Sequence, residues 1–324
     1  MPLIKGTPKD GYLEINDNIR FRKGVDFISN WGKTYFVDFE NGSDYHDGRS
    51  TFKALKNLAA AISKAGAWDI IYIRRRTPDV AEGDPVGITP ATAVNWSIAN
   101  TKWGLQLIGC GIGHDPQQAA YQTRLEGHAT VTGVAPLTVL APYVGLENLS
   151  FKRGGATGVP LVDLSTTVPA RAFAASLYRC QLHMGNGVNG SNGAVQINSH
   201  WYAAIIECHF ERCAVAIGLY SGISNPAAVH IRGNTFNQPA ADNKGDIVSA
   251  ATACHRIMIE DNTFNHDTPS AGGTNKFLYF PGSANTGSII GNKFGTATLV
   301  TATLMTLGGL VESGSICGKG FLTS

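Results

Sequence analysis

The chain has 324 residues, of which 43% are hydrophobic and only 15% are charged. The formal net charge is +2, and without a large basic cluster this argues against nucleic acid as a partner. The first residues lack the apolar stretch of a signal peptide, and no run reaches the ~18 apolar residues of a membrane helix. We therefore expect a soluble protein, made in a cytoplasm, without membrane contact. The six cysteines form no CxxC pair, so we expect neither a zinc site nor a cofactor.

Residues 1–32 do not fit the pattern of the remaining chain and are predicted to form an N-terminal arm. The segment 13–21 suggests short extended pieces, but it holds few apolar side chains for a core of its own. Such an arm often becomes ordered only against a partner or another subunit. The side chains predicted to make that attachment are Leu13, Ile15, Ile19 and Phe21.

A strand, a helix and a second strand follow the arm. Residues 34–38 and 69–73 have the β-branched and aromatic content of strands. Between them, Ser50 is a predicted N-cap, and apolar residues recur at helical spacing up to Gly66. The apolar residues are Phe52, Leu55, Leu58, Ala59 and Ile62. The sequence predicts a helix over about 50–65 that covers the open end of a repeated β-structure, where strand edges would otherwise be exposed.

The loop 41–48 contains oxygen-bearing side chains that calcium could bind. Asp44 and Asp47, with Asn41, are the candidates. The loop lacks the acidic spacing and the closing glutamate of an EF-hand. A turn with side-chain caps is the favoured interpretation, so no metal is predicted.

The rest of the chain repeats the pattern aliphatic-x-aliphatic-x-x-(Asn or Cys)-x-(Phe or Leu). Residues 229–236 and 257–264 fit at every position, and weaker copies extend the series in both directions. The repeats recur every ~28 residues, a period typical of solenoids. The final positions of the copies are Ile112, Phe151, Leu182, Phe210, Phe236, Phe264, Phe294 and Phe321.

The spacing within each repeat requires a bend. Alternate residues of a strand share a face, so Asn234 and Phe236 point the same way, whereas Ile231 and Asn234 are an odd number of residues apart. Ile231 and Asn234 can both face inward only if the chain turns at residues 232–233. Two short strands joined by a tight bend describe a right-handed parallel β-helix of about eight to ten rungs.

The buried positions beside the bend should form a ladder. Asn234, Asn262 and Asn292 would stack inward, each amide bonding its neighbours or the backbone of the bend. Cys180 and Cys208 occupy the same column in earlier rungs. A doubly wound α/β fold would need helices between strands, and a β-sandwich would need regular hairpin signals; the sequence has neither.

The region before the first complete repeat is similar to a known module. Residues 33–38, Asn41–Asp44, Asp47–Gly48, the predicted helix and residues 68–73 resemble the N-terminal module of the pectate-lyase-like right-handed β-helix superfamily. Leu107–Gly111 resembles the glycine-rich turn that follows it. The resemblance covers about 33–324, which we treat as one β-helix domain. It implies the fold, but the superfamily includes lyases, hydrolases, phage tailspikes and non-enzymatic virion proteins.

One pair of carboxylates could serve hydrolysis. In the column before the Asn position, Glu207 and Asp261 lie two rungs apart, or ~9.6 Å at the spacing of parallel strands, with His209 on the same edge. Glu207 neighbours Arg179, and Glu260, the residue before Asp261, should lie one rung from Arg232. Glu207 and Glu260 therefore also fit surface ion pairs. A lyase would need a basic residue to take the proton next to a carboxylate and, usually, calcium ligands. The sequence offers no tight Asp cluster on successive rungs and none of the Arg-bearing lyase motifs. Candidate glycan-binding aromatic residues are Trp201, Tyr202, Tyr220, Phe277, Tyr279 and Phe280.

These patterns favour a virion structural protein that resembles phage-type β-helix proteins of the capsid decoration, fibre or spike kind. It would attach to capsid or tail proteins through the arm, form a homo-oligomer, in particular a trimer, and reside in the virion after synthesis in the host cytoplasm. The alternatives are a tailspike-like polysaccharide depolymerase (a glycoside hydrolase or lyase) and a non-catalytic adhesin that binds a cell-surface glycan.

Overall fold

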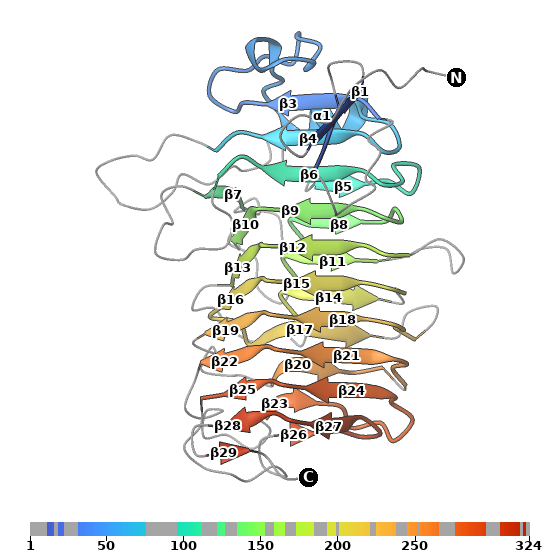
Figure 1. The fold of residues 1–324 in the computed structure, drawn as a ribbon. Helices are drawn as coiled ribbons and strands as arrows, with labels where there is room; N and C mark the ends of the chain where they lie inside the picture. Colours follow the sequence, from blue (N-terminus) through green and yellow to red (C-terminus); the bar gives the residue numbers. More distant parts are fainter. Residues whose placement is uncertain are drawn as a thin grey trace.

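The computed structural model is a right-handed parallel β-helix whose rungs lie above one another along a single axis (Figure 1). It describes residues 12–15, 19–22, 32–75, 96–111, 122–126, 135–152, 159–165, 173–184, 193–198, 201–220, 225–237, 245–251, 253–265, 276–295, 305–317 and 320–321. Among these residues, none forms a helix that is both long and apolar enough to span a bilayer.

Three sheets form the walls of the solenoid, and we number them in the order in which the chain enters them within a rung. Sheet 1 contains β3 (Thr34–Val37), β4 (Ile70–Ile73), β6 (Gln106–Gly109), β9 (Gly145–Glu147), β12 (Ser176–Tyr178), β15 (Ala204–Ile206), β18 (His230–Arg232), β21 (Ile257–Glu260), β24 (Gly287–Ile290) and β27 (Val311–Ser313). Sheet 2 contains β7 (Thr123–Glu126), β10 (Leu149–Lys152), β13 (Gln181–His183), β16 (His209–Glu211), β19 (Thr235–Asn237), β22 (Thr263–Asn265), β25 (Lys293–Phe294), β28 (Ile316–Cys317) and β29 (Gly320–Phe321). Sheet 3 contains β5 (Trp96–Ile98), β8 (Leu137–Val139), β11 (Val162–Leu164), β14 (Val195–Asn198), β17 (Val215–Tyr220), β20 (Gly245–Ser249), β23 (Lys276–Tyr279) and β26 (Met305–Thr306).

The predicted ladder is present at the corner between sheets 1 and 2. Asn234 donates through Nδ2 to the Ile205 carbonyl oxygen (2.9 Å) and to Asn262 Oδ1 (3.0 Å), and its backbone N–H also donates to Asn262 Oδ1 (2.9 Å). Asn262 makes the equivalent bonds to Ile231 and Asn292. All three side chains are almost fully buried, so the ladder supplies the partners that their polar atoms lose from water.

The bend beside the ladder uses left-handed backbone, as the odd spacing requires. Gly233 has φ +65°, and the same position in neighbouring rungs is occupied by Glu207 (φ 53°) and Asp261 (φ 54°). Inside the corner, the predicted phenylalanines stack with ring centroids 5.0 Å (Phe210–Phe236), 4.6 Å (Phe236–Phe264) and 4.7 Å (Phe264–Phe294) apart. Such stacking adds about 0.5–1.5 kcal/mol per pair to the burial of each ring.

The terminal copies of the repeat were assigned to wrong residues. The residue in register with Phe151 is Leu125, so Ile112, which lies outside the described residues, is not the position that ends this copy. At the other end Cys317 pairs with Phe294, and Ser315 takes the Asn position by accepting from the Asn292 N–H (3.2 Å). Phe321 instead lies on β29, which is antiparallel to β28. A long insertion before Leu125 and a short rung before Cys317 change the spacing between repeats, and the sequence pattern therefore pointed to the wrong residues.

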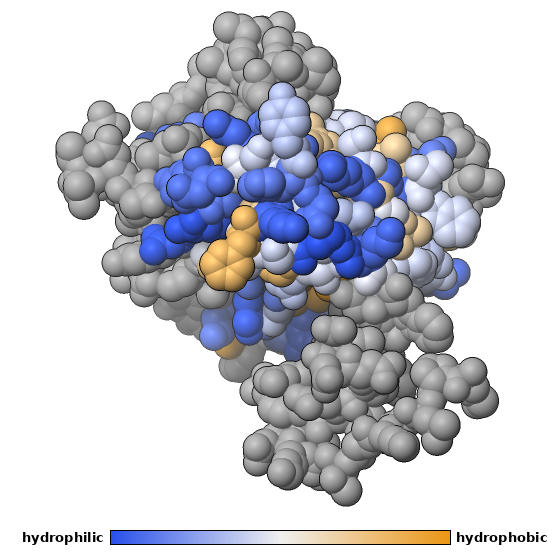
Figure 2. Space-filling model, turned by 90° about the horizontal axis from the view of Figure 1, so that it is seen from above, coloured by the Kyte–Doolittle hydropathy of each residue, from blue (hydrophilic) through white to orange (hydrophobic). Residues whose placement is uncertain are grey.

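The predicted N-terminal helix is two shorter elements. A 3-10 turn (Thr51–Lys53) follows the Ser50 cap, and α1 (Leu58–Lys64) begins after Asn57. Leu55 forms a β-bridge to Val37 between them, Phe52 is exposed, and Ala59 lies on the exposed side of α1. The buried Leu58, Ala61 and Ile62 pack against β3, β4 and β5. Viewed along the axis from this end, the described surface is mostly hydrophilic, so the cap closes the apolar core (Figure 2).

The ladder predicts that substitution of a buried amide lowers the free energy of unfolding far more than substitution of an exposed amide. Asn262→Asp replaces two donating hydrogens by a buried charge and should lower the free energy of unfolding by about 3 kcal/mol or more. Asn265→Asp, at an exposed position of the next strand, should change it by less than about 0.5 kcal/mol. Thermal and urea melts of the two variants measure the difference. Equal melts would mean that the ladder contributes nothing.

Candidate functional site

The outer face of sheet 2 carries polar side chains on four successive strands, and we call these eight residues the sheet 2 polar face. They are the residues on either side of inward-facing Leu125, Phe151, Leu182 and Phe210, so strand alternation points them outward. The inner column, in register across the strands, is Arg124, Ser150, Gln181 and His209. The outer column is Glu126, Lys152, His183 and Glu211.

The two columns differ in their access to solvent. All four members of the inner column are buried although they point away from the core; Arg124, for example, is 5% exposed. The outer column is accessible at about a quarter of each side chain, for example 22% for His183 and 33% for Lys152. Chemistry at the outer column would therefore take place beside a polar layer shielded from water, where charge interactions are stronger than in bulk solvent.

Opposite charges alternate along the polar face. Glu126 Oε1 lies 3.8 Å from Arg124 Nη1 and 3.9 Å from Lys152 Nζ. Farther along, Glu211 Oε2 lies 3.7 Å from His183 Nδ1 and accepts a hydrogen bond from Gln181 Nε2 (3.4 Å). Glu126 thus lies within 4 Å of a cation on its own strand and of a second cation on the adjacent strand.

His183 is the side chain best placed to exchange a proton. Burial lowers its pKa below the ordinary value of 6.5; Glu211 opposes this shift, and the positive charges of Lys152, Arg212 and Arg124 reinforce it. The imidazole is therefore neutral at neutral pH. Its Nδ1 faces Glu211, whereas Nε2 has no hydrogen-bond partner within the described part of the chain. A neutral ring with a carboxylate near one nitrogen can act as a base through the other.

The structure separates the acids predicted from sequence from this face. Arg179 Nε lies 2.8 Å from Glu207 Oε2, and Arg232 Nε lies 3.6 Å from Asp261 Oδ2, both at the convex corner between sheets 1 and 2. About half or more of each carboxylate side chain is exposed (47% and 60%). Glu260 lies in register with Arg232 one rung away, as expected, and its Oε2 lies 3.0 Å from His230 Nε2. His209 belongs to the buried column of the polar face, where Nε2 lies 3.4 Å from Asn237 Nδ2.

The residues that the sequence analysis missed left a signal. Each anchor of the repeat is flanked by outward-facing residues, as in Gln181–His183 and His209–Glu211, but only the column before the Asn position was considered. Arg124 and Glu126 could not be recognised in this way, because the insertion before β7 hides Leu125 as the final position of its repeat. His183 and Lys152 are 31 residues apart in sequence and become neighbours only through strand pairing.

The other predicted sites have structural explanations or lie outside the description. Asp44 Oδ1 accepts from the N–H groups of Lys56 (3.0 Å) and Asn57 (2.9 Å), and Asp47 Oδ1 accepts from Arg49 N–H (3.0 Å), so both act as turn caps. In the arm, β1 (Tyr12–Ile15) and β2 (Ile19–Arg22) pair antiparallel. The side chains proposed for attachment (Leu13, Ile15, Ile19 and Phe21) are outside the described structure, so the attachment stays a prediction.

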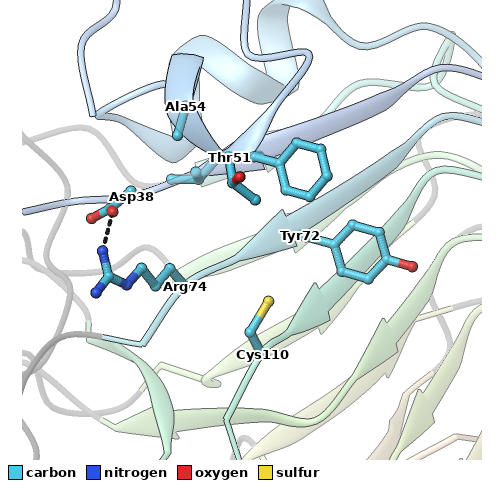
Figure 3. A pocket seen from close by; sticks show the side chains of 8 residues that line it. Asp38, Thr51, Ala54, Tyr72, Arg74 and Cys110 are labelled. Atoms are coloured by element: carbon cyan, nitrogen blue, oxygen red, sulfur yellow. Dashed lines mark hydrogen bonds and ion pairs between the residues drawn. The ribbon is translucent and has the colours of Figure 1, made fainter. Parts of the chain in front are cut away.

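A pocket of about 360 Å³ lies against the N-terminal strands of sheet 1 (Figure 3). Its lining residues are Phe36, Val37, Asp38, Thr51, Ala54, Tyr72, Arg74 and Cys110. Arg74 reaches to Asp38, as the dashed line in Figure 3 shows. Burial acts to raise the pKa of Asp38, but hydrogen bonds from Asn41, Arg74 and Glu40 outweigh it and lower that pKa. Burial also raises the pKa of the Cys110 thiol. Neither group is suited to proton transfer at neutral pH.

Sheet 3 carries a separate cluster around Asp163. Asp163 Oδ1 accepts from Ser165 Oγ (2.7 Å) and Asn198 Nδ2 (3.3 Å). Burial raises its pKa in spite of these bonds. Its neighbours in register, Thr138 and Gln196, are neutral, so this cluster offers one acid without a second charged group.

Solved structures share the fold. A lacto-N-biosidase of glycoside hydrolase family 136 from Eubacterium ramulus matches with a TM-score of 0.50 and 12% sequence identity, over 88% of this chain and 63% of that chain. A rhamnogalacturonan lyase matches with a TM-score of 0.30 and 14% identity, over 88% of this chain and 66% of that one. The chain thus spans slightly less than two thirds of these proteins. No family model matches it, and no curated protein matches it by sequence. At 12% identity, the likeness to the lacto-N-biosidase establishes the β-helix fold alone.

The charges around His183 predict how its pKa responds to substitution. Because Glu211 raises this pKa, Glu211→Gln should lower it further, and because Lys152 lowers it, Lys152→Met should raise it. NMR titration of the histidine ring signals measures all three proteins. A His183 pKa above 6.5 in the unmodified chain, or shifts of the opposite sign, would contradict the arrangement described here.

Proposed function

We propose that this protein is a polysaccharide depolymerase, namely a lyase that cleaves uronic-acid-containing polymers on the sheet 2 polar face. The observation that carries the proposal is a neutral histidine with one cation, Lys152, on the adjacent strand and a second, Arg124, two strands away in the shielded column. This is the combination that removal of a proton next to a carboxylate requires.

Elimination needs both a base and cations. The C5 proton of a uronic acid becomes acidic when cations stabilise the negative charge that develops on the adjacent carboxylate. We assign this role to Lys152 and Arg124. His183 Nε2 takes the C5 proton, the C–H electrons form a C4=C5 double bond, and the C4–O4 bond breaks. The leaving oxygen takes a proton from water. Glu211 orients the ring and stabilises its protonated form.

Carboxylate spacing favours elimination over hydrolysis. Glu126 and Glu211 lie three strands apart in the outer column, or roughly 14 Å at the parallel-strand spacing. Inverting hydrolases place their two carboxylates at about 6.5–9.5 Å, and retaining enzymes place them closer. Glu207 and Asp261 have a separation near the upper limit, but both are exposed and ion-paired with arginine.

Fold similarity contributes little to the choice. The lacto-N-biosidase shares the solenoid, yet one fold hosts many activities, so the residues of the polar face carry the proposal. The virion structural role, the trimer and attachment through the arm stay predictions, because no contact within the described residues bears on them.

Substitution of the proposed base is the direct test. His183→Ala should lower kcat by about 10²-fold or more, since general bases contribute that much. The assay follows the ultraviolet absorbance of the new double bond with polygalacturonate, alginate, hyaluronan and xanthan as substrates. The matched control is His46→Ala, which changes a histidine in the loop before the 3-10 turn, and it should leave the rate unchanged.

Two results would oppose the proposal. If the unmodified protein releases reducing ends without the absorbing double bond, it is a hydrolase. If Glu207→Gln abolishes cleavage while His183→Ala does not, the chemistry belongs to the corner between sheets 1 and 2 instead of the polar face.

The neutral His183 also determines how kcat/KM changes at acidic pH. Because His183 must be unprotonated, kcat/KM should fall as pH decreases through its pKa, which lies below 6.5. The midpoint of this fall should coincide with the His183 pKa obtained by NMR. A fall centred above pH 6.5 would assign the essential base to another group.

A further inference from the structure

A line of exposed aromatic side chains follows the corner between sheets 3 and 1. Backbone hydrogen bonds connect this corner from rung to rung: Trp68 N–H donates to the Trp103 carbonyl oxygen, Tyr143 N–H to that of Phe173, and Tyr202 N–H to that of Ala227. We call the aromatic residues of five successive rungs the aromatic stripe. They are the exposed Trp68, Trp103, Tyr143, Trp201 and Tyr202 and the half-buried Phe173.

The rings are presented to solvent and organised by contacts among themselves. Trp68, Tyr143 and Tyr202 are 48%, 45% and 53% exposed. The Trp68 ring lies across Gly104 and stacks on Tyr143, with centroids 5.8 Å apart and planes inclined by 26°. A Cβ at Gly104 would lie 2.1 Å from the Trp68 ring, so only glycine admits this stack. Phe173 and Trp201 meet edge to face at 6.1 Å.

The stripe occupies positions where aromatic side chains are sterically costly. Trp68 (φ 64°), Tyr143 (φ 61°) and Tyr202 (φ 58°) have left-handed backbone, which bulky residues rarely adopt. The turn itself does not need rings, because Ala174 (φ 53°) and Ala228 (φ 52°) fill the same position in other rungs. The rings at these positions are therefore additions that the turn does not require.

The surroundings indicate which ligand the stripe fits. The neighbouring outward column of sheet 1 is small at Gly145, Ser176 and Ala204, so the rings are accessible from the side. Among the residues that the structure describes here, Lys102 Nζ donates to the Ser63 and Ala65 carbonyl oxygens, and Asp69 is buried, so neither charge faces the stripe freely. Nucleic acid would require cations for its phosphates. A protein partner would need about 800 Å² on each side, which a line one or two side chains wide does not provide.

We propose that the aromatic stripe binds a polysaccharide chain lying parallel to the solenoid axis. The apolar C–H faces of sugar rings stack on aromatic rings, and the rung spacing of ~4.8 Å is close to the length of one pyranose unit. Successive sugars can therefore meet successive rungs. This corner lies between sheets 3 and 1, away from the polar face of sheet 2, so the stripe anchors polymer independently of the proposed cleavage.

Glycine substitution removes the rings without removing the turn. Tyr143→Gly combined with Tyr202→Gly keeps a residue suited to left-handed backbone, so this variant should melt at or above the temperature of the unmodified chain. Ala174→Gly combined with Ala228→Gly changes the same backbone positions without touching a ring and is the matched control. Affinity electrophoresis of the full chain measures binding in gels containing pectin, alginate, xanthan, galactan or hydroxyethyl cellulose.

The expected result is retardation of the unmodified chain and of the alanine-to-glycine control by at least one polymer. The tyrosine-to-glycine variant should bind that polymer about tenfold more weakly. If no polymer retards the unmodified chain, or if both variants are retarded alike, the stripe does not bind polysaccharide. If the tyrosine-to-glycine variant instead dissociates an oligomer in sedimentation, the stripe is a contact between copies of the chain.

The test is separate from that of the lyase activity. Loss of retardation with full cleavage of short oligosaccharides supports the stripe and leaves the catalytic proposal intact. Retardation without cleavage of any polymer supports the stripe and removes the catalytic proposal.

Discussion

The hydrogen-bonded corner between sheets 1 and 2 is the constraint on which the solenoid depends. Each rung must return the chain to a point directly above its start. A turn made within two residues buries backbone N–H and C=O groups in the core. The left-handed residue before each ladder position makes the turn, and the amides of Asn234, Asn262 and Asn292 satisfy the backbone that the turn buries. In the rungs before this ladder, Cys180 and Cys208 fill the column and place their sulfur atoms near backbone carbonyl oxygens.

This corner also determines what the outer face of sheet 2 can do. Because the corner fixes the register between rungs, residues about 30 positions apart are aligned in columns at the strand spacing. An outward grid of this kind can bring a base, cations and an acid together without a loop to hold them. Lys152, His183 and Glu211 are such a series, and their mutual distances follow from strand pairing rather than from local sequence.

The corner between sheets 3 and 1 shows a different use of the same principle. It also turns through left-handed residues, and as at the first corner their side chains are largely free of the core, so packing does not dictate their identity. The chain has placed tryptophan and tyrosine at three of these positions and alanine at others. One corner therefore stabilises the core by buried amides, and the other presents rings at the period of the rungs.

Much of this could be predicted from the sequence, and the limits follow from what a local pattern contains. Asn234, Asn262, Asn292 and the phenylalanine column were predicted because burial constrains those positions in every rung. The first and last rungs were misplaced, since the insertion before Leu125 and the short rung ending at Cys317 break the period.

The sequence by itself thus determined the fold class, the bend and the buried ladder, because each depends on spacing within one repeat. Only the tertiary structure decided which outward residues become neighbours. Outward positions carry no pattern imposed by packing, so the meeting of His183 with Lys152, or of Trp68 with Tyr143, depends on which strands pair and in which register. A single inserted residue in a loop leaves the repeat recognisable, whereas a shift of register by one strand position would separate these side chains.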